Sequence, residues 1–551
     1  MPFIGEIFSQ LATDAMVLQE IRDGQVTGVT GRQLLELIRK ARTFLAAKGL
    51  KKGDRCGLLA ANSIRWVAMD LAAMAEGLIV VPLYSRQAPP ELVALVKDSA
   101  PALVCCGDAT LRDGIQKVWS GFNGEAPPHF LFDEIFAGTE GVALDRPQVR
   151  EADAVTIIYT SGTSGEAKGV VLTAANVGFM LGCTSARLDS LMGGRSGQDR
   201  IFHYLPFSFC ASWIAMLTFL LRGSLVTLNT DLTKIPNDMP VVSPHYFLNV
   251  PQLLERMRRG VDEQIAQRGG IAQAIYSRAK AAWIRQKEKR PQSGDTLWLW
   301  LANALAFPAI RNKMVGENLK ALICGSAPLT PETQDYFSML GIPVLQVYGL
   351  TETTGICSMD DPASPVGGRV GPAIPGIEMR LGDSDEIVVR GPNVFPGYWN
   401  RPQQTAEVLR DGWFHTGDQG EADASGNWRI VGRIKSLIVL GSGHKIAPET
   451  VEEEVAHHLP GAQQVVVVGN GRGYLSAIVT GNVTGEQVQA ALDAVNPNLP
   501  HYKQVRAFRL RQEPFSVDSG MLTAMGKLKR DVIASRLKDE IDDMYRVKQA
   551  V

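Results

Sequence analysis

The first part of the chain alternates between two spacings of apolar residues. Helical spacing, with apolar positions three and four residues apart, runs through 34–45 and 64–75. Short continuous apolar runs at 56–60, 78–83 and 102–106 each have the length of a buried strand. Strands that alternate with helices in this way predict βαβ units on a largely parallel sheet.

Strand patterns dominate after about residue 350. Three of them, at 377–382, 386–391 and 428–433, are separated by turns rich in Gly, Pro and Asp. The pattern changes again at about residue 436, where two helical and two strand patterns form one compact unit, at 451–459, 464–469, 474–481 and 486–495. The fold class is therefore predicted as α/β: a large N-terminal α/β domain with parallel sheets and a β-rich subdomain, plus a small α+β C-terminal domain.

Two long apolar stretches have to be weighed as membrane spans. The stretch 201–221 meets the length rule of about 20 residues, but Pro206 and several hydroxyl residues interrupt it and a β-branched strand pattern follows. The stretch 296–310 is shorter and contains Pro308. A helix that feeds a buried strand is the preferred interpretation of the first stretch, and a buried or interfacial helix that of the second.

Composition and charge narrow the class of protein. The chain has 551 residues, and 56 Lys and Arg against 57 Asp and Glu give a net charge of −1, which argues against nucleic acid as the main partner. The seven cysteines show no CxxC spacing, and the N-terminus lacks the basic start and apolar run of a secretory signal. We therefore expect a cytoplasmic protein.

The stretch from Ala154 to Thr173 is the most informative in the chain. A hydrophobic strand leads into small and hydroxyl residues and one cation: Thr160, Ser161, Gly162, Thr163, Ser164, Gly165 and Lys168. Glycines allow backbone N–H groups to converge on anionic oxygens, hydroxyls add donors, and Lys168 adds charge, so the loop suits phosphates. The GxxxxGK[ST] phosphate loop is excluded, because Lys168 follows Gly165 by three residues and precedes Gly169. Taken alone, the loop could also be a flexible Ser/Gly hairpin.

The stretch YTSGTSGEAKGV resembles the signature loop of the adenylate-forming (AMP-binding) superfamily, which includes acyl-CoA synthetases, luciferases and peptide adenylation domains. Further stretches match that family in the same order: GSAPLT at 325–330, YGLTETTG at 348–355, GWFHTGD at 412–418, GRIKS at 432–436 and GKLKR at 526–530. Their joint occurrence covers nearly the whole chain. The resemblance implies ATP, Mg²⁺ and CoA as cofactors and substrates.

The resemblance implies a role for individual residues at the nucleotide. Glu352 is expected to hold Mg²⁺, Thr351 to donate to the α-phosphate, and Tyr348 with Gly349 to lie at the adenine. Asp418 is expected to accept the ribose hydroxyls, with Arg433 beside the ribose and phosphate. Without the motif, Tyr348 would be a core aromatic, and Asp418 and Arg433 turn or surface charges.

Lys527 is implied as the lysine that reaches the α-phosphate and the carboxylate during adenylation. By composition alone, GKLKR would be a solvated basic loop. In the family this lysine belongs to a small mobile domain that rotates about a hinge, which falls at Lys435. The implied domains are 1–432, a hinge at 433–435, and 436–551. Gly441, Gly443 and His444 resemble the loop that approaches the pantetheine arm of CoA.

Within the superfamily, long-chain fatty acyl-CoA synthetases resemble the chain most, on VPQLLERM at 250–257, on the insert from about 260 to 318 and on MLTAMGKLKR. The small residues Gly325, Ser326 and Ala327 would leave room for an alkyl chain beside the adenylate. LPFSFCASW at 205–213 becomes a wall of the acyl tunnel, with Phe209 lining it and Trp213 as its gate. Four positions depart from the family pattern: Ala167, Ala174, Phe209 and Ser436.

The resulting hypothesis is an ATP-dependent ligase that converts a medium- or long-chain fatty acid to acyl-AMP and then to acyl-CoA. One alternative is an acyl-AMP ligase that passes the acyl group to a carrier-protein pantetheine. Another is a catalytically inactive lipid-binding scaffold on the same fold, against which the intact Thr163, Lys168, Glu352, Asp418 and Lys527 weigh.

A peripheral membrane contact is predicted for 278–310. Six basic residues lie between 278 and 290 against the one acid Glu288, with Tyr276, Trp283 and Ile284 among them: Arg278, Lys280, Arg285, Lys287, Lys289 and Arg290. Basic and aromatic residues on one helix suit the anionic inner face of a membrane. The alternative is a helix that packs on the large domain with its charges in water.

Overall fold

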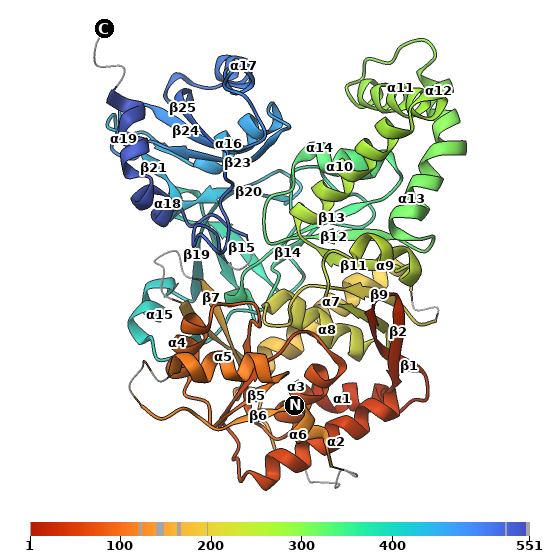
Figure 1. The fold of residues 1–551 in the computed structure, drawn as a ribbon, viewed down its shortest axis with the longest axis vertical. Coiled ribbons are helices and arrows are strands. Elements are labelled where there is room, and N and C mark those ends of the chain that lie inside the picture. Colours follow the sequence, from red (N-terminus) through yellow and green to blue (C-terminus); the bar gives the residue numbers. More distant parts are fainter. Residues whose placement is uncertain are drawn as a thin grey trace.

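The computed structural model describes residues 2–119, 121, 124–138, 148–161, 167–194, 197–523 and 526–546. Figure 1 shows three parts: a large body at the bottom that contains the N-terminus, a small C-terminal domain at the upper left, and a helical insert at the upper right. The two large sheets of the body, the β-rich subdomain and the small domain agree with the predicted α/β class.

A seven-stranded sheet confirms the βαβ units predicted from the apolar runs. Its strand order is β17-β8-β7-β4-β3-β5-β6, in which β8 runs antiparallel to its two neighbours β7 and β17 and the pairs from β7 to β6 are parallel. The strands are β3 (Arg55–Leu59), β4 (Ile79–Leu83), β5 (Leu103–Cys106), β6 (His129–Leu131), β7 (Ala154–Ser161), β8 (Ala167–Thr173) and β17 (Gly397–Tyr398). The helices that accompany these strands are α2 (Gly31–Ala47), α3 (Ile64–Ala75), α4 (Pro89–Ser99), α5 (Ala109–Trp119) and α6 (Phe132–Phe136).

An eight-stranded sheet has the order β14-β13-β12-β11-β9-β10-β1-β2, and only the edge strands β2 and β14 run antiparallel. Its strands are β1 (Met16–Arg22), β2 (Gln25–Thr30), β9 (Arg200–His203), β10 (Leu225–Asn229), β11 (Tyr246–Asn249), β12 (Ala321–Cys324), β13 (Val344–Tyr348) and β14 (Ser358–Met359). The remaining helices of this part are α1 (Pro2–Gln10), α7 (Ala174–Met192), α8 (Cys210–Leu221), α9 (Ile235–Val242) and α14 (Pro331–Met339).

The apolar stretch 201–221 is divided between β9 and α8, and α8 leads to the buried strand β10, which confirms the predicted helix that feeds a buried strand. α8 has 12 residues, and most of its side chains are buried in the core formed with α3. Within the part of the chain that the structure describes, no helix is long and apolar enough to cross a membrane.

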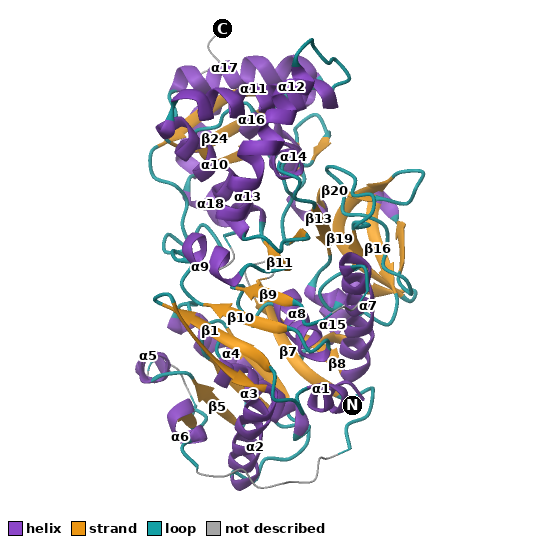
Figure 2. Cartoon of the chain, turned by 90° about the vertical axis from the view of Figure 1, so that its right-hand side faces the viewer, coloured by secondary structure: helices purple, strands orange, loops and turns teal. Residues whose placement is uncertain are grey.

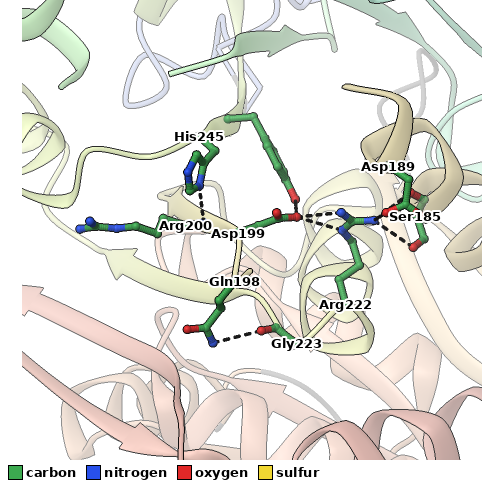
Figure 3. A network of polar contacts seen from close by, with 9 residues as sticks. Ser185, Asp189, Gln198, Asp199, Arg200, Arg222, Gly223 and His245 are labelled. Carbon is green, nitrogen blue, oxygen red and sulfur yellow. Dashed lines mark hydrogen bonds and ion pairs between the residues drawn. The ribbon is translucent and has the colours of Figure 1, made fainter. Parts of the chain in front are cut away.

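A buried polar network fixes α7 and α8 against the eight-stranded sheet (Figure 3). The Arg222 guanidinium, at the end of α8, donates to Asp199 at 2.8 Å, to Asp189 at 2.6 Å and to the Ser185 carbonyl at 2.9 Å. Tyr246 of β11 donates to the same Asp199 carboxylate at 2.8 Å. Because a buried charge that loses its partner is costly, the network specifies how these helices lie on the sheet.

The β-rich subdomain predicted after residue 350 is an antiparallel sheet, seen in Figure 2 beside α7 and α15 (Pro402–Val408). Its strands are β15 (Glu378–Leu381), β16 (Glu386–Arg390), β18 (Leu409–Arg410), β19 (Trp413–Ala422) and β20 (Trp428–Arg433). β20 ends at Arg433, and the short helix η4 (Ile434–Ser436) leads into the small domain.

The small domain has two hydrophobic clusters of its own, which begin at Ile438. Its elements are β21 (Ile438–Val439), β22 (Lys445–Ile446), α16 (Pro448–His457), β23 (Ala462–Val468), β24 (Leu475–Gly481), α17 (Gly485–Val495), β25 (Val505–Arg511), α18 (Arg530–Arg536) and α19 (Lys538–Arg546). β23 pairs antiparallel with β24, and β24 pairs parallel with β25. The two helices and two strands predicted here are confirmed, whereas the hinge at 433–435 stays a prediction.

The helical insert lies between β11 and β12. It consists of α10 (Pro251–Arg268), α11 (Gly270–Lys287), α12 (Asp295–Leu301), the π-helical turn η1 (Ala302–Ala306) and α13 (Phe307–Val315). The apolar stretch 296–310 is therefore spread over α12, η1 and α13.

Candidate active site

The turn after β13 carries Thr351 and Glu352 on the short helix η2 (Thr351–Thr353). Gly349 allows this turn to fold back on itself, because a Cβ at that position would lie 2.4 Å from the Gly355 carbonyl oxygen. The loop before β17 stabilises this turn through two hydrogen bonds to its backbone carbonyls. Phe395 donates its backbone N–H to the Glu352 carbonyl at 2.9 Å, and Asn393 donates to the Thr353 carbonyl at 3.2 Å.

Glu352 and Lys168 meet at Tyr398, a residue that the sequence analysis did not single out. The Tyr398 hydroxyl donates to Glu352 Oε1 at 2.8 Å, and Lys168 Nζ lies 5.0 Å from the centre of the Tyr398 ring. Tyr398 is in β17, which pairs with β8, the strand that contains Lys168. Burial raises the pKa of Tyr398, and the Glu352 charge raises it further. The signal in the sequence was the GYWN pattern at 397–400, in which an aromatic residue directly follows a glycine.

Asp418 is the centre of a second cluster. Its Oδ2 accepts a hydrogen bond from the Tyr348 hydroxyl at 2.7 Å, and its Oδ1 accepts one from Arg433 Nε at 2.7 Å. Asp418 and Arg433 face each other across the pairing of β19 with β20, which fixes their register. Burial and the Asp418 charge hold the pKa of Tyr348 well above its ordinary value. The expected neighbours Tyr348, Asp418 and Arg433 thus lie together, from segments 70 residues apart.

Lys527, an exposed residue of the small domain, interacts electrostatically with the same cluster. Its pKa is lowered by surrounding protein atoms that displace water and by the charge of Arg433, while Asp418 acts in the opposite direction. The lysine loop, Thr523–Lys527, is closed by a bond from the Thr523 N–H to the Lys527 carbonyl at 2.7 Å. Gly526 has φ +77° and lies against Gln252 of α10, whose Nε2 would be 3.2 Å from a Cβ at this position. Gly526 therefore packs on the large domain, and the charge of the neighbouring Lys527 interacts with that of Asp418.

The phosphate loop predicted from the sequence connects β7 to β8, an antiparallel pair in which Thr160 faces Lys168 and Ser161 faces Ala167. Gly162, Thr163, Ser164 and Gly165 lie outside the described residues. The pairing places the start of this loop and Lys168 at one end of the hairpin, next to Tyr398.

Glu352 suits a cation that takes few ligands from the protein. Among the described residues, no group of three or more His, Cys, Asp or Glu side chains is arranged to hold a metal ion. Mg²⁺ is bound by one or two carboxylates together with substrate phosphates and water in nucleotide enzymes. A single carboxylate beside a lysine fits that mode of binding.

The proposed acyl side of the site starts at Gly325, where a Cβ would lie 2.6 Å from Val347 Cγ2 and so only glycine fits. Ser326, with φ +74°, and Ala327 follow and are exposed. Phe209, directly before α8, packs against Tyr84 with ring centres 5.4 Å apart.

Trp213 differs from its predicted role as a gate. It is fully buried, and its indole N–H donates to Asp70 Oδ2 of α3 at 3.0 Å. A gate must swing, and this contact ties the ring into the core between α3 and α8. The placement favours a packing role.

The predicted hinge and CoA loop lie in the small domain and at its border. Lys435 is exposed on η4. Gly441, Gly443 and His444 are exposed in the turn between β21 and β22, where His444 stacks on Tyr502 with ring centres 4.2 Å apart. Their roles in domain rotation and in pantetheine binding stay predictions.

Together the described groups bring two carboxylates, Glu352 and Asp418, and three cations, Lys168, Arg433 and Lys527, to one site. Cations of this kind stabilise negative charge on transferring phosphate groups. A paired-oxygen acceptor such as Asp418 suits two neighbouring hydroxyl donors.

Comparison with known proteins finds two family models that together match most of the chain. The family model described as AMP-binding enzyme matches residues 11–399, and the model described as AMP-binding enzyme C-terminal domain matches residues 435–549. The long-chain-fatty-acid–CoA ligase FadD15 of Mycobacterium bovis is 29% identical over an alignment of 580 positions, covering 97% of this chain and 94% of that protein. Long chain acyl-CoA synthetase 3 of Arabidopsis thaliana is 26% identical and covers 97% of this chain and 90% of that protein.

A solved structure shows the same fold. The o-succinylbenzoate CoA synthetase of Bacillus subtilis, in complex with an acyl-adenylate intermediate, superimposes with a TM-score of 0.74 at 20% identity, covering 96% of this chain and 97% of that chain. Because the first family model alone spans well over half of the sequence, the chain belongs to the AMP-binding enzyme family.

Proposed function

We propose that the protein is an ATP-dependent fatty acid–CoA ligase. In the first step an oxygen of the fatty acid carboxylate attacks the α-phosphorus of ATP, the bond to the β-phosphate oxygen breaks, and pyrophosphate leaves. In the second step the CoA sulfur attacks the acyl carbonyl carbon, the bond to the AMP oxygen breaks, and the thiol proton passes to water. The relatives named as long-chain fatty acid ligases support this substrate class.

The observation that carries the proposal is the ion pair of Asp418 with Arg433 beside Tyr348, together with the charge of Lys527, which interacts electrostatically with both members of this pair. These groups come from two domains: Asp418 and Arg433 from the β-rich subdomain and Lys527 from the small domain. A cation at this position can neutralise the charge that develops on the α-phosphate as the carboxylate approaches. Asp418 would orient the ribose, and Tyr348 the adenine ring.

Lys168, Glu352 and Tyr398 would act at the other end of the nucleotide. Mg²⁺, when bound, would supply positive charge at the phosphates, with Glu352 as its protein ligand. Lys168 would attract the leaving pyrophosphate, and Tyr398 would hold the Glu352 carboxylate in one orientation. Some of these residues would therefore orient the nucleotide, and the others would stabilise its charge.

The test is to incubate the full chain with palmitate, ATP, Mg²⁺ and CoA, and to measure pyrophosphate release and palmitoyl-CoA separately. We expect pyrophosphate only when fatty acid is present, and thioester only when CoA is added. Pyrophosphate without thioester would identify an acyl-AMP ligase that uses another acceptor, such as a carrier-protein pantetheine. Absence of pyrophosphate with fatty acids of every length would overturn the ligase assignment and favour a lipid-binding scaffold.

The proposal extends to the place where substrate is collected. Long-chain fatty acids partition into bilayers, so a peripheral contact with a membrane through 278–310 would shorten their route to the site.

A further inference from the structure

The end of the helical insert exposes an unusual share of apolar side chains. Eleven large hydrophobic residues are exposed in the described part of the chain, and five of them lie between residues 271 and 305. Trp300 is 65% exposed, Leu305 63% and Leu297 55%. In Figure 1, α11 and α12 form the end of the insert that is directed away from the two large sheets.

Three of these side chains form one apolar stripe on α12 and η1. Leu297 and Trp300 are three residues apart and so lie on the same helix face, and Leu305 follows one to two turns later. The opposite face is already used for packing, because Leu299 and Ala302 contact the cluster that contains Tyr276 and Phe307. The exposed stripe is therefore additional to the face that the fold requires.

The insert is also strongly basic in a nearly neutral protein. Residues 271–313 contain eight Lys or Arg residues and two acids, whereas the whole chain has a net charge of −1. An apolar stripe on a basic segment is typical of helices that lie in the interface of an anionic membrane.

The basic helix face itself is not free, which corrects the sequence expectation for 278–290. Lys280 pairs with Asp262 at 3.2 Å, Lys287 pairs with Asp335 at 2.5 Å, and Arg285 pairs with Asp295. Arg278 stacks on Trp298, with its guanidinium carbon 4.5 Å from the ring centre. In the turn between α11 and α12, Lys289 and Arg290 are exposed and form no ion pair with any described residue.

We propose that Leu297, Trp300 and Leu305 insert into the interface of an anionic bilayer, with Lys289 and Arg290 at the lipid phosphates. The inference deepens the proposed function, because it names the surface through which a fatty acid ligase would meet its lipid source. The apolar side chains supply the attachment, and the two charges supply the preference for anionic lipid. Attachment should therefore weaken with salt but not vanish.

The test is co-sedimentation of the full chain with vesicles of phosphatidylcholine alone or with about one third phosphatidylglycerol, in the absence of fatty acid, ATP and CoA. The variant Leu297→Ser with Trp300→Ser should lower the bound fraction about tenfold or more on both vesicles, since two apolar side chains no longer leave water. The matched control, Val241→Ser with Leu381→Ser, changes two exposed apolar residues elsewhere and should bind as the parent does.

A second pair of variants separates charge from apolar insertion. Lys289→Gln with Arg290→Gln should remove most of the preference for anionic vesicles and leave binding to neutral vesicles unchanged. Lys51→Gln with Lys538→Gln, two exposed lysines outside the insert, is the control. Brominated lipids should quench part of the tryptophan fluorescence of the parent but less in Trp300→Phe, which reports insertion even if the serine variant folds poorly.

Three outcomes would overturn the proposal: no binding of the parent to either vesicle, equal loss in the apolar control pair, or equal quenching in Trp300→Phe. A dimer of the parent that the serine variant abolishes, seen by light scattering, would assign the stripe to a second copy instead. Activity on octanoate dissolved in water tests the ligase separately. A protein that loses vesicle binding but keeps full octanoate activity is still consistent with the ligase assignment. A protein that binds vesicles but has no octanoate activity is still consistent with the docking surface.

Discussion

At the residue scale, Tyr398 connects the two groups expected to handle the phosphates. Its hydroxyl holds Glu352 and its ring lies under Lys168. Tyr398→Phe keeps the ring and removes the hydrogen bond to a charged group, which is worth about 1.5–3 kcal/mol. We expect the apparent Mg²⁺ requirement of adenylation to rise about tenfold or more, with a smaller change in the KM for fatty acid.

The measurement is pyrophosphate release against Mg²⁺ concentration, together with direct binding of Mn²⁺ in the presence of ATP. Tyr474→Phe is the control, because that hydroxyl donates to a carbonyl inside the small domain at 3.1 Å. An unchanged metal requirement in Tyr398→Phe would show that Glu352 is held in place without it.

Two buried residues give the stability of the large domain opposite dependences on pH. Burial lowers the pKa of His203 from 6.5 to about 4, so its contribution to stability is lost as the pH falls below 6.5. Burial raises the pKa of Asp70 from 3.8 to about 7, so its contribution is lost as the pH rises from about 4 to above 7. Between pH 7 and pH 5 each changes the free energy of unfolding by about 2 kcal/mol, with opposite sign.

Each substitution removes one of the two opposing pH effects, so the variant should show the effect of the remaining residue. Asp70→Asn keeps an acceptor for Trp213, and its free energy of unfolding relative to the parent should rise toward high pH and fall toward pH 5. His203→Gln should change in the opposite direction. Urea unfolding at several pH values checks both, with the exposed His458→Gln as control. Parallel profiles for parent and variants would mean that neither group titrates in the folded protein as its burial implies.

At the scale of elements, the lysine loop is the part of the small domain that reaches the site. Hydrogen bonds within Thr523–Lys527 and the contact of Gly526 with Gln252 hold it there. Lys527→Ala should lower acyl-AMP formation a hundredfold or more, on the order of the effect of removing one stabilising group from a developing charge. Conversion of supplied acyl-AMP and CoA to thioester should change little, because the thiol attacks a carbonyl and not the phosphate.

The two half-reactions are measured separately by pyrophosphate release and by thioester formation. Lys529→Ala, two residues further along the same basic stretch, is the matched control and should retain both. Equal loss of the two half-reactions in a folded Lys527→Ala variant would refute a role limited to adenylation.

At the scale of the whole molecule, the small domain touches the large one near the site. His457 of α16 lies 3.7 Å from Glu332 of α14, and both side chains are about half exposed. In this arrangement the charge of Lys527 interacts with that of Asp418, which suits adenylation. If the domain must rotate to admit CoA, then fixing this contact should stop the reaction after the first step.

Cysteines introduced together at Glu332 and His457 can be joined by a short thiol cross-linker. We expect the cross-linked protein to keep acyl-AMP formation and to lose thioester formation, with single-cysteine variants treated in the same way as controls. Full thioester activity after complete cross-linking would contradict rotation about the hinge at 433–435.

The sequence by itself determined the elements and the family. Apolar spacing placed α3 at Ile64–Ala75 and the strands β3, β4 and β5 to within one residue, because the apolar residues that these buried elements require follow one another closely in the sequence. The motifs likewise assigned Glu352, Asp418, Arg433 and Lys527 to one reaction, although these residues are spread over 176 positions.

Only the tertiary structure decided which side chains meet. The contact of Tyr398 with Glu352, the bond of Trp213 to Asp70 and the pairing of Lys280, Arg285 and Lys287 with acids all join residues whose spacing shows no local pattern. A charge or aromatic ring that looks free in the sequence is thereby committed to a partner from another element. The physical reason is that partner choice depends on how sheets and helices pack, and that packing is set by the long-range burial of the whole chain.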